Sequence, residues 1–257
     1  MVAQPGITEL VLITPANHPT YRELVAPLAE ACWPEFMLHD AVADRLWGAL
    51  FERFGDYQFG LLDPLTGRAA AMGNSVPLRW EAPLEELPER GWDWAMEQAV
   101  RDHQAGNQPN IQCAIQVAID PAYRGRSVST RMVQAMRAVA ISKGFSQLIA
   151  PVRPSQKADY PLSNIDRYIE WKTEQGLAFD AWLRVHQRAG AKIIKVCHES
   201  MTISGSADDW RSWTGISFPE TGQYYVPGAL NPVEADLKAG TVTYIEPNVW
   251  MVHALEG

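Results

Sequence analysis

The stretch that decides the fold runs from Ile115 to Met132 and reads IQVAIDPAYRGRSVSTRM. It begins as a β-branched, apolar run typical of a strand and then enters a basic turn, Tyr123-Arg124-Gly125-Arg126. From Ser127 onward the apolar residues follow helical spacing. The first N–H groups of a helix lack intrahelical acceptors and carry partial positive charge, so they bind anions. The stretch therefore predicts a site for a diphosphate-containing cofactor.

This corner resembles motif A of the GCN5-related N-acetyltransferase superfamily, in which a strand leads into an Arg/Gln-x-x-Gly-x-Gly/Ala loop and a helix. Arg124 occupies the basic first position, while Ser127 and Ser129 stand where the family prefers glycine and glycine or alanine. Serine keeps a small side chain and an N–H, although its hydroxymethyl group restricts how closely a phosphate approaches. The resemblance is strongest from about residue 111 to residue 198.

The resemblance implies how a thioester donor, acetyl-CoA or another acyl-CoA, is held. In the family, the motif A strand splays from the next parallel strand, and the pantetheine arm lies between them. Backbone groups of Val117 and Ile119 would hold the arm and polarise the thioester carbonyl. The diphosphate would be bound by the loop and first helical turn: Arg124, Gly125, Arg126, Ser127, Val128, Ser129 and Thr130.

One histidine is the candidate catalytic residue. The family commonly places a tyrosine four residues before a Gly-Phe pair, as acid to the leaving thiolate. This chain has Gly190-Ala191 there, and His186 stands four residues before Gly190. An imidazole could protonate the thiolate or relay a proton from the amine. In the alternative, His186 is a core histidine, because it lies in the apolar stripe of its own helix.

Composition limits the class of protein. The 257 residues carry a formal net charge of −8, which argues against a nucleic-acid-binding face. Three widely spaced cysteines form neither a disulfide framework nor a CxxC metal pair, so no metal site is expected. We see no signal peptide and no apolar run long enough to span a membrane. The expectation is a soluble cytoplasmic protein.

Periodicity predicts the order of elements. We expect strands near 10–14, 57–62, 68–76, 111–119, 146–152, 193–203 and 241–252, and helices near 20–32, 40–54, 92–103, 128–144 and 179–189. Odd-numbered residues of the 111–119 strand are expected on one face and even-numbered residues on the other. Together with the resemblance, this predicts one α/β (α+β) domain over 1–257, with a mixed, mostly antiparallel sheet and helices on both faces. Two insertions, 153–177 and 204–240, are expected to shape a substrate pocket, which six tryptophans could line: Trp80, Trp92, Trp94, Trp210, Trp213 and Trp250.

Three functional hypotheses follow. The first is an acyl-CoA-dependent N-acyltransferase in which a small-molecule amine attacks the thioester directly. The second keeps the fold and takes an acyl carrier protein thioester as donor, or decarboxylates it. The third is a non-catalytic module that binds a CoA ester or a metabolite. The identity of the acceptor and the oligomeric state, a homodimer included, stay open at this stage.

Overall fold

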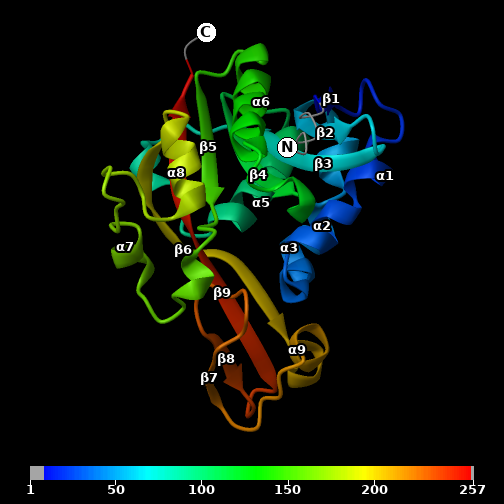
Figure 1. Cartoon of the computed structure of the whole chain (residues 1–257). Coiled ribbons are helices and arrows are strands. Elements are labelled where there is room, and N and C mark those ends of the chain that lie inside the picture. The colour runs from blue at the N-terminus through cyan, green and yellow to red at the C-terminus, as the bar shows by residue number, and fades with distance from the viewer. Residues whose placement is uncertain (1–8, 256–257) are drawn as a thin grey trace, which may run out of the picture.

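The computed structural model describes residues 9–255 of the chain. Its strands form one sheet with the order β1-β2-β3-β4-β5-β9-β8-β7, and β6 pairs with the opposite edge of β9 (Figure 1). All strand pairs are antiparallel except β4 with β5, as expected for a mixed, mostly antiparallel sheet. The strands are β1 Val11–Ile13, β2 Gln58–Asp63, β3 Arg68–Leu78, β4 Ile111–Ile119, β5 Gln147–Val152, β6 Lys192–Gly205, β7 Gly222–Tyr224, β8 Val233–Asp236 and β9 Thr241–Ala254.

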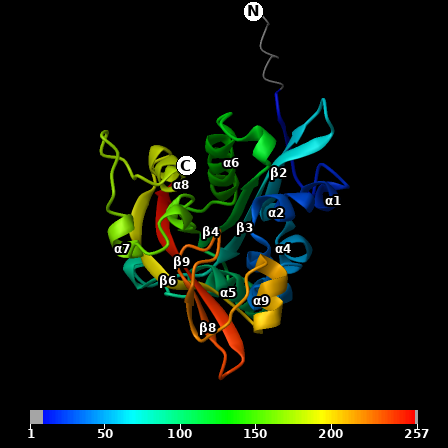
Figure 2. The same ribbon diagram turned by 60° about the horizontal axis from the view of Figure 1, so that its bottom comes forward.

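Helices cover both faces of this sheet (Figures 1 and 2). One face is covered by α6 and α8, which bury Met132, Met136 and Leu183. The other face is covered by the helices from α1 to α5, which bury Val25 and Trp92 among others. The helices are α1 Tyr21–Val25, α2 Pro27–Cys32, α3 Ala41–Leu46, α4 Ala49–Glu52, α5 Gly91–Ala105, α6 Val128–Ser142, α7 Ile165–Tyr168, α8 Ala181–Arg188 and α9 Ala207–Thr214. Within residues 9–255, none of these helices has the length and apolarity to cross a membrane.

Two of the expected helices are divided. The 20–32 helix separates into α1 and α2 at Pro27, which has no N–H to donate and occupies the first position of α2. The 40–54 helix separates into α3 and α4 around Gly48, which has low helix propensity. Asp40 caps α3 as expected, because its carboxylate accepts hydrogen bonds from the N–H groups of Val42 and Ala43.

A β-bulge interrupts β4 at Ile115. Along β3 the pairing moves by one residue, from Asn74 to Ser75, while along β4 it moves by two, from Gln116 to Ala114. Ile115 is therefore an extra residue without a partner on β3. Because strand side chains alternate with a period of two, one extra residue exchanges the faces of everything that follows.

The expectation that the odd-numbered residues of β4 share one face is consequently wrong beyond the bulge. Ile111, Cys113 and Ile115 are buried in the core with α5. Val117 and Ile119 pack in the core on the opposite face, with α6. A strand-wide alternation in the sequence could not reveal this exchange, since the bulge is fixed by pairing with β3.

The sheet opens between β4 and β5. Their parallel pairing is limited to Gln112 with Leu148 and Cys113 with Ile149. Beyond this point β4 continues to Ile119 without pairing to β5, which instead pairs with β9 on its other edge. The two strands thus diverge from a common point, starting next to the bulge.

The segment 204–240, expected as an insertion, contains α9, β7 and β8. Ser206 and Asp209 form a reciprocal capping box at the start of α9. β8 pairs with the first residues of β9, so β6, β8 and β9 extend together away from β4 and β5 (Figure 1). This extension is anchored by the ring of Phe36, which stacks on Trp210 at 5.5 Å. The other expected insertion, 153–177, holds the short helix α7.

Candidate active site

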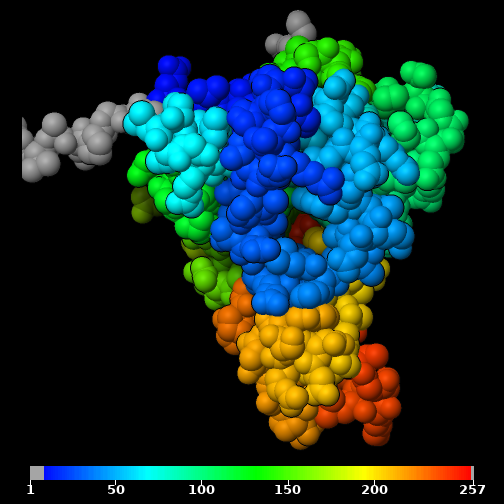
Figure 3. Space-filling model, turned by 90° about the vertical axis from the view of Figure 1, so that its right-hand side faces the viewer, coloured from blue at the N-terminus to red at the C-terminus, as the bar shows by residue number. Residues whose placement is uncertain are grey.

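A cavity of about 1150 Å³ occupies the space between the diverging halves of β4 and β5. One wall is formed by residues 114–119 of β4, and the facing wall by residues 150–153 at the end of β5. Residues of α2, α3, α6 and α8 complete the lining. Figure 3 shows an opening among the N-terminal helical segments (blue), with atoms of segments late in the chain (red and yellow) visible at its bottom. Size and concavity suit an extended small-molecule ligand.

The loop that follows β4 presents a run of free N–H groups. Among residues 9–255, no acceptor is found for the N–H groups of residues 125–130, the last three of which open α6. Gly125 has φ +74° and Ser127 has φ +60°, so the backbone adopts the left-handed conformation at two of three consecutive residues. Ser127 is the only non-glycine residue of the described chain with positive φ. Consecutive unpaired N–H groups at the start of a 15-residue helix form an anion-binding concavity, which fits a diphosphate.

The basic side chains around this loop have different surroundings. Arg124 lines the cavity. The guanidinium of Arg126 lies over the ring of Tyr123 at 5.6 Å, and the Tyr123 hydroxyl donates to Asp63 at 2.7 Å. Tyr123 therefore packs and anchors the loop. Arg131 instead donates to the carbonyl of Leu10.

The backbone of Val117 and Ile119 faces the cavity. The N–H of Asp120 donates to the carbonyl of Ala70, which makes Ile119 and Ala71 a non-hydrogen-bonded pair in the antiparallel β3–β4 ladder. By alternation, Val117 has the same orientation. The N–H and C=O groups of both residues then point away from β3, toward the gap left by β5. The Ile119 carbonyl accepts a hydrogen bond from the Cys32 thiol at 3.2 Å.

His186 lies on α8, is 5% exposed and lines the cavity. Its Nδ1 is 2.9 Å from Nε2 of His253, and Nδ1 of His253 is 3.2 Å from Nη1 of Arg137. Burial lowers the pKa of His186 to about 3 and that of His253 to about 4, so both rings are neutral at pH 7.

The chain of contacts fixes the tautomers of this pair. A guanidinium can only donate, so Nδ1 of His253 is an acceptor and its Nε2 carries the proton. That N–H donates to Nδ1 of His186, which leaves the proton of His186 on Nε2. His186 therefore offers one N–H donor from its cavity-lining ring. His186 is a buried histidine, as in the alternative reading, and it also forms part of the cavity wall, so its catalytic role stays a prediction.

The tryptophans that line the cavity differ from those expected. Of the six, only Trp92 contributes to the lining. Trp94 packs edge-on against Trp80 and Trp250, and Trp210 and Trp213 belong to the core of the C-terminal extension. The other tryptophans of the lining are Trp33, Trp47 and Trp182. Periodicity could not separate these sets, because a large aromatic ring fills a core and a cavity wall equally well.

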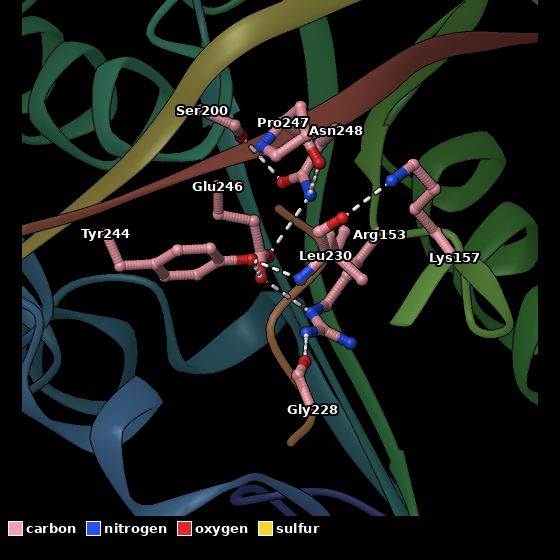
Figure 4. A network of polar contacts seen from close by, with 9 residues as sticks. All are labelled: Arg153, Lys157, Ser200, Gly228, Leu230, Tyr244, Glu246, Pro247 and Asn248. Carbon is pink, nitrogen blue, oxygen red and sulfur yellow. Dashed lines mark hydrogen bonds and ion pairs between the residues drawn. The ribbon is translucent and has the colours of Figure 1, made fainter. Parts of the chain in front are cut away.

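A buried polar network at the β5 side of the cavity was missed by the sequence analysis (Figure 4). Arg153, the first residue after β5, donates from Nε to Oε2 of Glu246 at 2.8 Å. The Tyr244 hydroxyl donates to the same oxygen at 3.0 Å, and Nδ2 of Asn248 donates to Oε1 at 3.2 Å. Glu246 is fully buried in the middle of the apolar strand β9. The available signal was this lone charge in a buried strand, together with an arginine directly after another buried strand.

Gln112 and Gln116 of β4, expected on one face, are separated by the bulge. Gln112 donates to the Ser75 hydroxyl at 2.9 Å and to the Met136 carbonyl of α6 at 3.4 Å, which is a structural role. Gln116 lines the cavity.

Known proteins resemble this chain in sequence and in fold. No family model matches it. Arginine N-acetyltransferase avaD of Aspergillus versicolor is 30% identical over 249 residues, which are 87% of this chain and 85% of that protein. The loading GNATL domain of CurA from Lyngbya majuscula superimposes with a TM-score of 0.63 at 17% identity, covering 96% of this chain and 98% of that domain. The GphF GNAT-like decarboxylase in complex with isobutyryl-CoA gives a TM-score of 0.55 at 15% identity, covering 96% of this chain and all of that one. Three findings agree: the sequence relative, the splayed β4–β5 pair and the free N–H groups at the start of α6. The chain is an acyltransferase that belongs to the GCN5-related N-acetyltransferase superfamily.

Proposed function

We propose that the chain transfers an acyl group, most readily acetyl, from a coenzyme A thioester to the amine of a small molecule. The observation that carries the proposal is the run of six N–H groups without acceptors among the described residues, placed where the cavity between β4 and β5 begins. The 30% identity to an arginine N-acetyltransferase supports an amine acceptor. The three free cysteines suit a reducing compartment, which we take to be the cytoplasm.

In this proposal the diphosphate is held by Arg124, Gly125, Arg126, Ser127, Val128, Ser129 and Thr130, through backbone N–H groups and two guanidinium charges. The outward N–H and C=O groups of Val117 and Ile119 align the pantetheine arm and the thioester, since they lie on the β4 wall of the same cavity. The donor supplies an activated acyl carbon. The chain supplies alignment and the exclusion of water, which account for a large part of the rate enhancement in such transfers.

His186 is the proposed residue at the leaving sulfur. Because its pKa is depressed to about 3, the ring is neutral, and its Nε2–H stabilises the departing thiolate by a hydrogen bond. The amine nitrogen forms a bond to the acyl carbon as the carbon–sulfur bond breaks. The proton lost by the attacking nitrogen and the proton gained by the sulfur balance, and the products are an amide and free coenzyme A.

Calorimetric titration with coenzyme A, followed by a thiol-release assay with acetyl-CoA and a panel of amines, tests the proposal. We expect binding with one site per chain and amine-dependent thiol release. Absence of binding at millimolar coenzyme A would contradict the cofactor site. Binding without transfer to any amine would select the non-catalytic module, and transfer from a loaded carrier protein alone would select the carrier-protein donor.

A further inference from the structure

We propose that Arg153 binds a carboxylate of the acceptor, so that the acceptor is an amino acid rather than a simple amine. This inference rests on the proposed function, since it describes the acceptor side of the same cavity. It adds to that function a substrate class and the residue that selects it.

The position of Arg153 places it opposite the cofactor loop. β4 and β5 are last paired at Cys113 and Ile149 and then diverge. Each strand leads into one segment that lines the cavity. β4 leads into the free N–H groups of residues 125–130, and β5 leads directly into Arg153. Both segments line the same cavity. An acyl donor that lies along β4 therefore leaves the β5 wall free to bind the acceptor amine.

The guanidinium of Arg153 is held rigidly and is only partly used. Nε donates to Glu246 at 2.8 Å, and Nη2 donates to the carbonyl of Gly228 at 2.6 Å. The ring of Trp33 lies 5.7 Å from the guanidinium carbon. Nη1 has no acceptor among residues 9–255, and Figure 4 shows this third nitrogen directed away from both Glu246 and Gly228. An arginine stays charged in a protein, so this free edge offers a fixed, charge-assisted donor in the cavity wall.

The carboxylate of Glu246 is occupied by donors from the chain itself. Oε2 of Glu246 accepts from Arg153 and Tyr244, and Oε1 accepts from Asn248. With its oxygens engaged and its side chain 1% exposed, Glu246 is a positioning residue that fixes the arginine. The free donor that this network offers to the cavity is therefore Nη1 of Arg153, which selects an anionic group on the ligand.

Arg124 and Arg188 line the same cavity, and its helical wall also carries acidic groups that suit a ligand with a cation. These are Glu30 of α2 and Asp44 of α3, both solvent-accessible carboxylates. A zwitterionic amino acid matches this distribution, with its carboxylate on Arg153 and its positive charge toward the acidic side.

The test compares acceptors that differ only in the carboxylate. The full chain is assayed with acetyl-CoA and two pairs, L-arginine with agmatine and L-phenylalanine with phenethylamine. We expect kcat/KM for at least one amino acid to exceed that of its amine by about 10- to 100-fold, the range expected for one charge-assisted hydrogen bond. In Arg153→Met the preference should disappear, with the loss confined to the amino acid and expressed mainly in KM. Arg153→Lys should recover part of it.

Removing Arg153 leaves Glu246 buried without a counter-charge, which can impair folding. The double variant Arg153→Met/Glu246→Gln removes both charges, and its activity on agmatine or phenethylamine reports on the intact fold. Arg211→Met, which removes an exposed arginine of α9, is the matched control and should keep the wild-type preference.

Equal kcat/KM values within both wild-type pairs, or a preference for the amines, would overturn the inference and leave the proposed function standing. Acetylation of neither member of either pair would overturn it as well. In that case the coenzyme A titration and the wider amine panel decide whether the proposed function falls with it.

Discussion

Replacing Asp93 by asparagine should change how the stability of the protein depends on pH. Asp93 of α5 and Asp40, the N-cap of α3, are both buried, and Oδ1 of Asp93 and Oδ2 of Asp40 have no hydrogen-bond partner among the described residues. Burial, and after it the neighbouring Asp40 carboxylate, raise the pKa of Asp93 to about 8. The guanidinium of Arg90, 3.9 Å from the Asp93 carboxylate, lowers the pKa of Asp93, and the carboxylate of Glu97 raises it. One proton held by Asp93 would satisfy both free oxygens.

The sign and size of the effect follow from proton linkage. An unfolded Asp93 ionises near its ordinary pKa of 3.8, while the folded one holds its proton up to about pH 8. Between these values the native state binds more protons, so the contribution of this group to stability falls as pH rises, by about 1.4 kcal/mol per pH unit. From pH 5 to pH 7 the wild type should lose about 2.7 kcal/mol relative to Asp93→Asn, which cannot titrate and still donates to Asp40. In a chain of this size that corresponds to roughly 5–10 °C in Tm.

Urea unfolding of the wild type and Asp93→Asn at pH 5, 6 and 7 measures this difference directly. Titrating groups that do not contact Asp93 contribute equally to both proteins and cancel in the comparison. Asp40 is coupled to Asp93, so the measured difference belongs to this pair of carboxyl groups. Asp208→Asn changes a carboxylate that is 83% exposed and is the control. Its unfolding free energy should depend on pH as that of the wild type does. A constant difference between Asp93→Asn and wild type across this range would refute a proton held between the two carboxyl groups.

Three further predictions concern the site. His186→Ala should bind coenzyme A normally and lose about 100-fold in kcat, measured by thiol release, because the donor at the leaving sulfur is gone; an unchanged kcat would remove that role. Ser127→Val should weaken coenzyme A binding about 5- to 30-fold in calorimetry, because a β-branched residue at φ +60° costs about 1–2 kcal/mol. Ser127→Gly should bind coenzyme A at least as tightly as the wild type. Equal losses in both variants would show that the loop conformation does not determine binding. The stability contributed by neutral His186 and His253 should be lost as pH falls from 6.5 toward their folded pKa values of about 3 and 4, and His186→Gln should reduce this loss in acid titrations monitored by circular dichroism.

The proposed cofactor side of the cavity could be predicted from the sequence, because the residues that form it are neighbours in the chain. A strand end, a glycine-containing basic turn and a helix start follow one another between Ile115 and Met132, and backbone N–H groups at a helix start need no distant partner to be free. The order of elements along the chain could be predicted for the same reason, since each core strand carries its own apolar pattern. The break at Pro27 and the elements within 204–240 were not predicted, because these elements are short and their signals in the sequence are weak.

The proposed acceptor side of the cavity could not be predicted from the sequence, because its residues are distant in the chain. Arg153 and Glu246 are 93 positions apart, and His186 and His253 are 67 apart, so no local pattern pairs them. The bulge at Ile115 likewise arises from the register between β3 and β4, and it alone turns Val117 and Ile119 to the face of α6. The sequence by itself determined a strand end, a basic turn and a helix start in direct succession, and the order of elements along the chain, because both depend on neighbouring residues. Only the tertiary structure decided which charged side chains meet in the cavity, because a buried charge is stabilised by whichever partner the folded sheet brings within hydrogen-bonding distance.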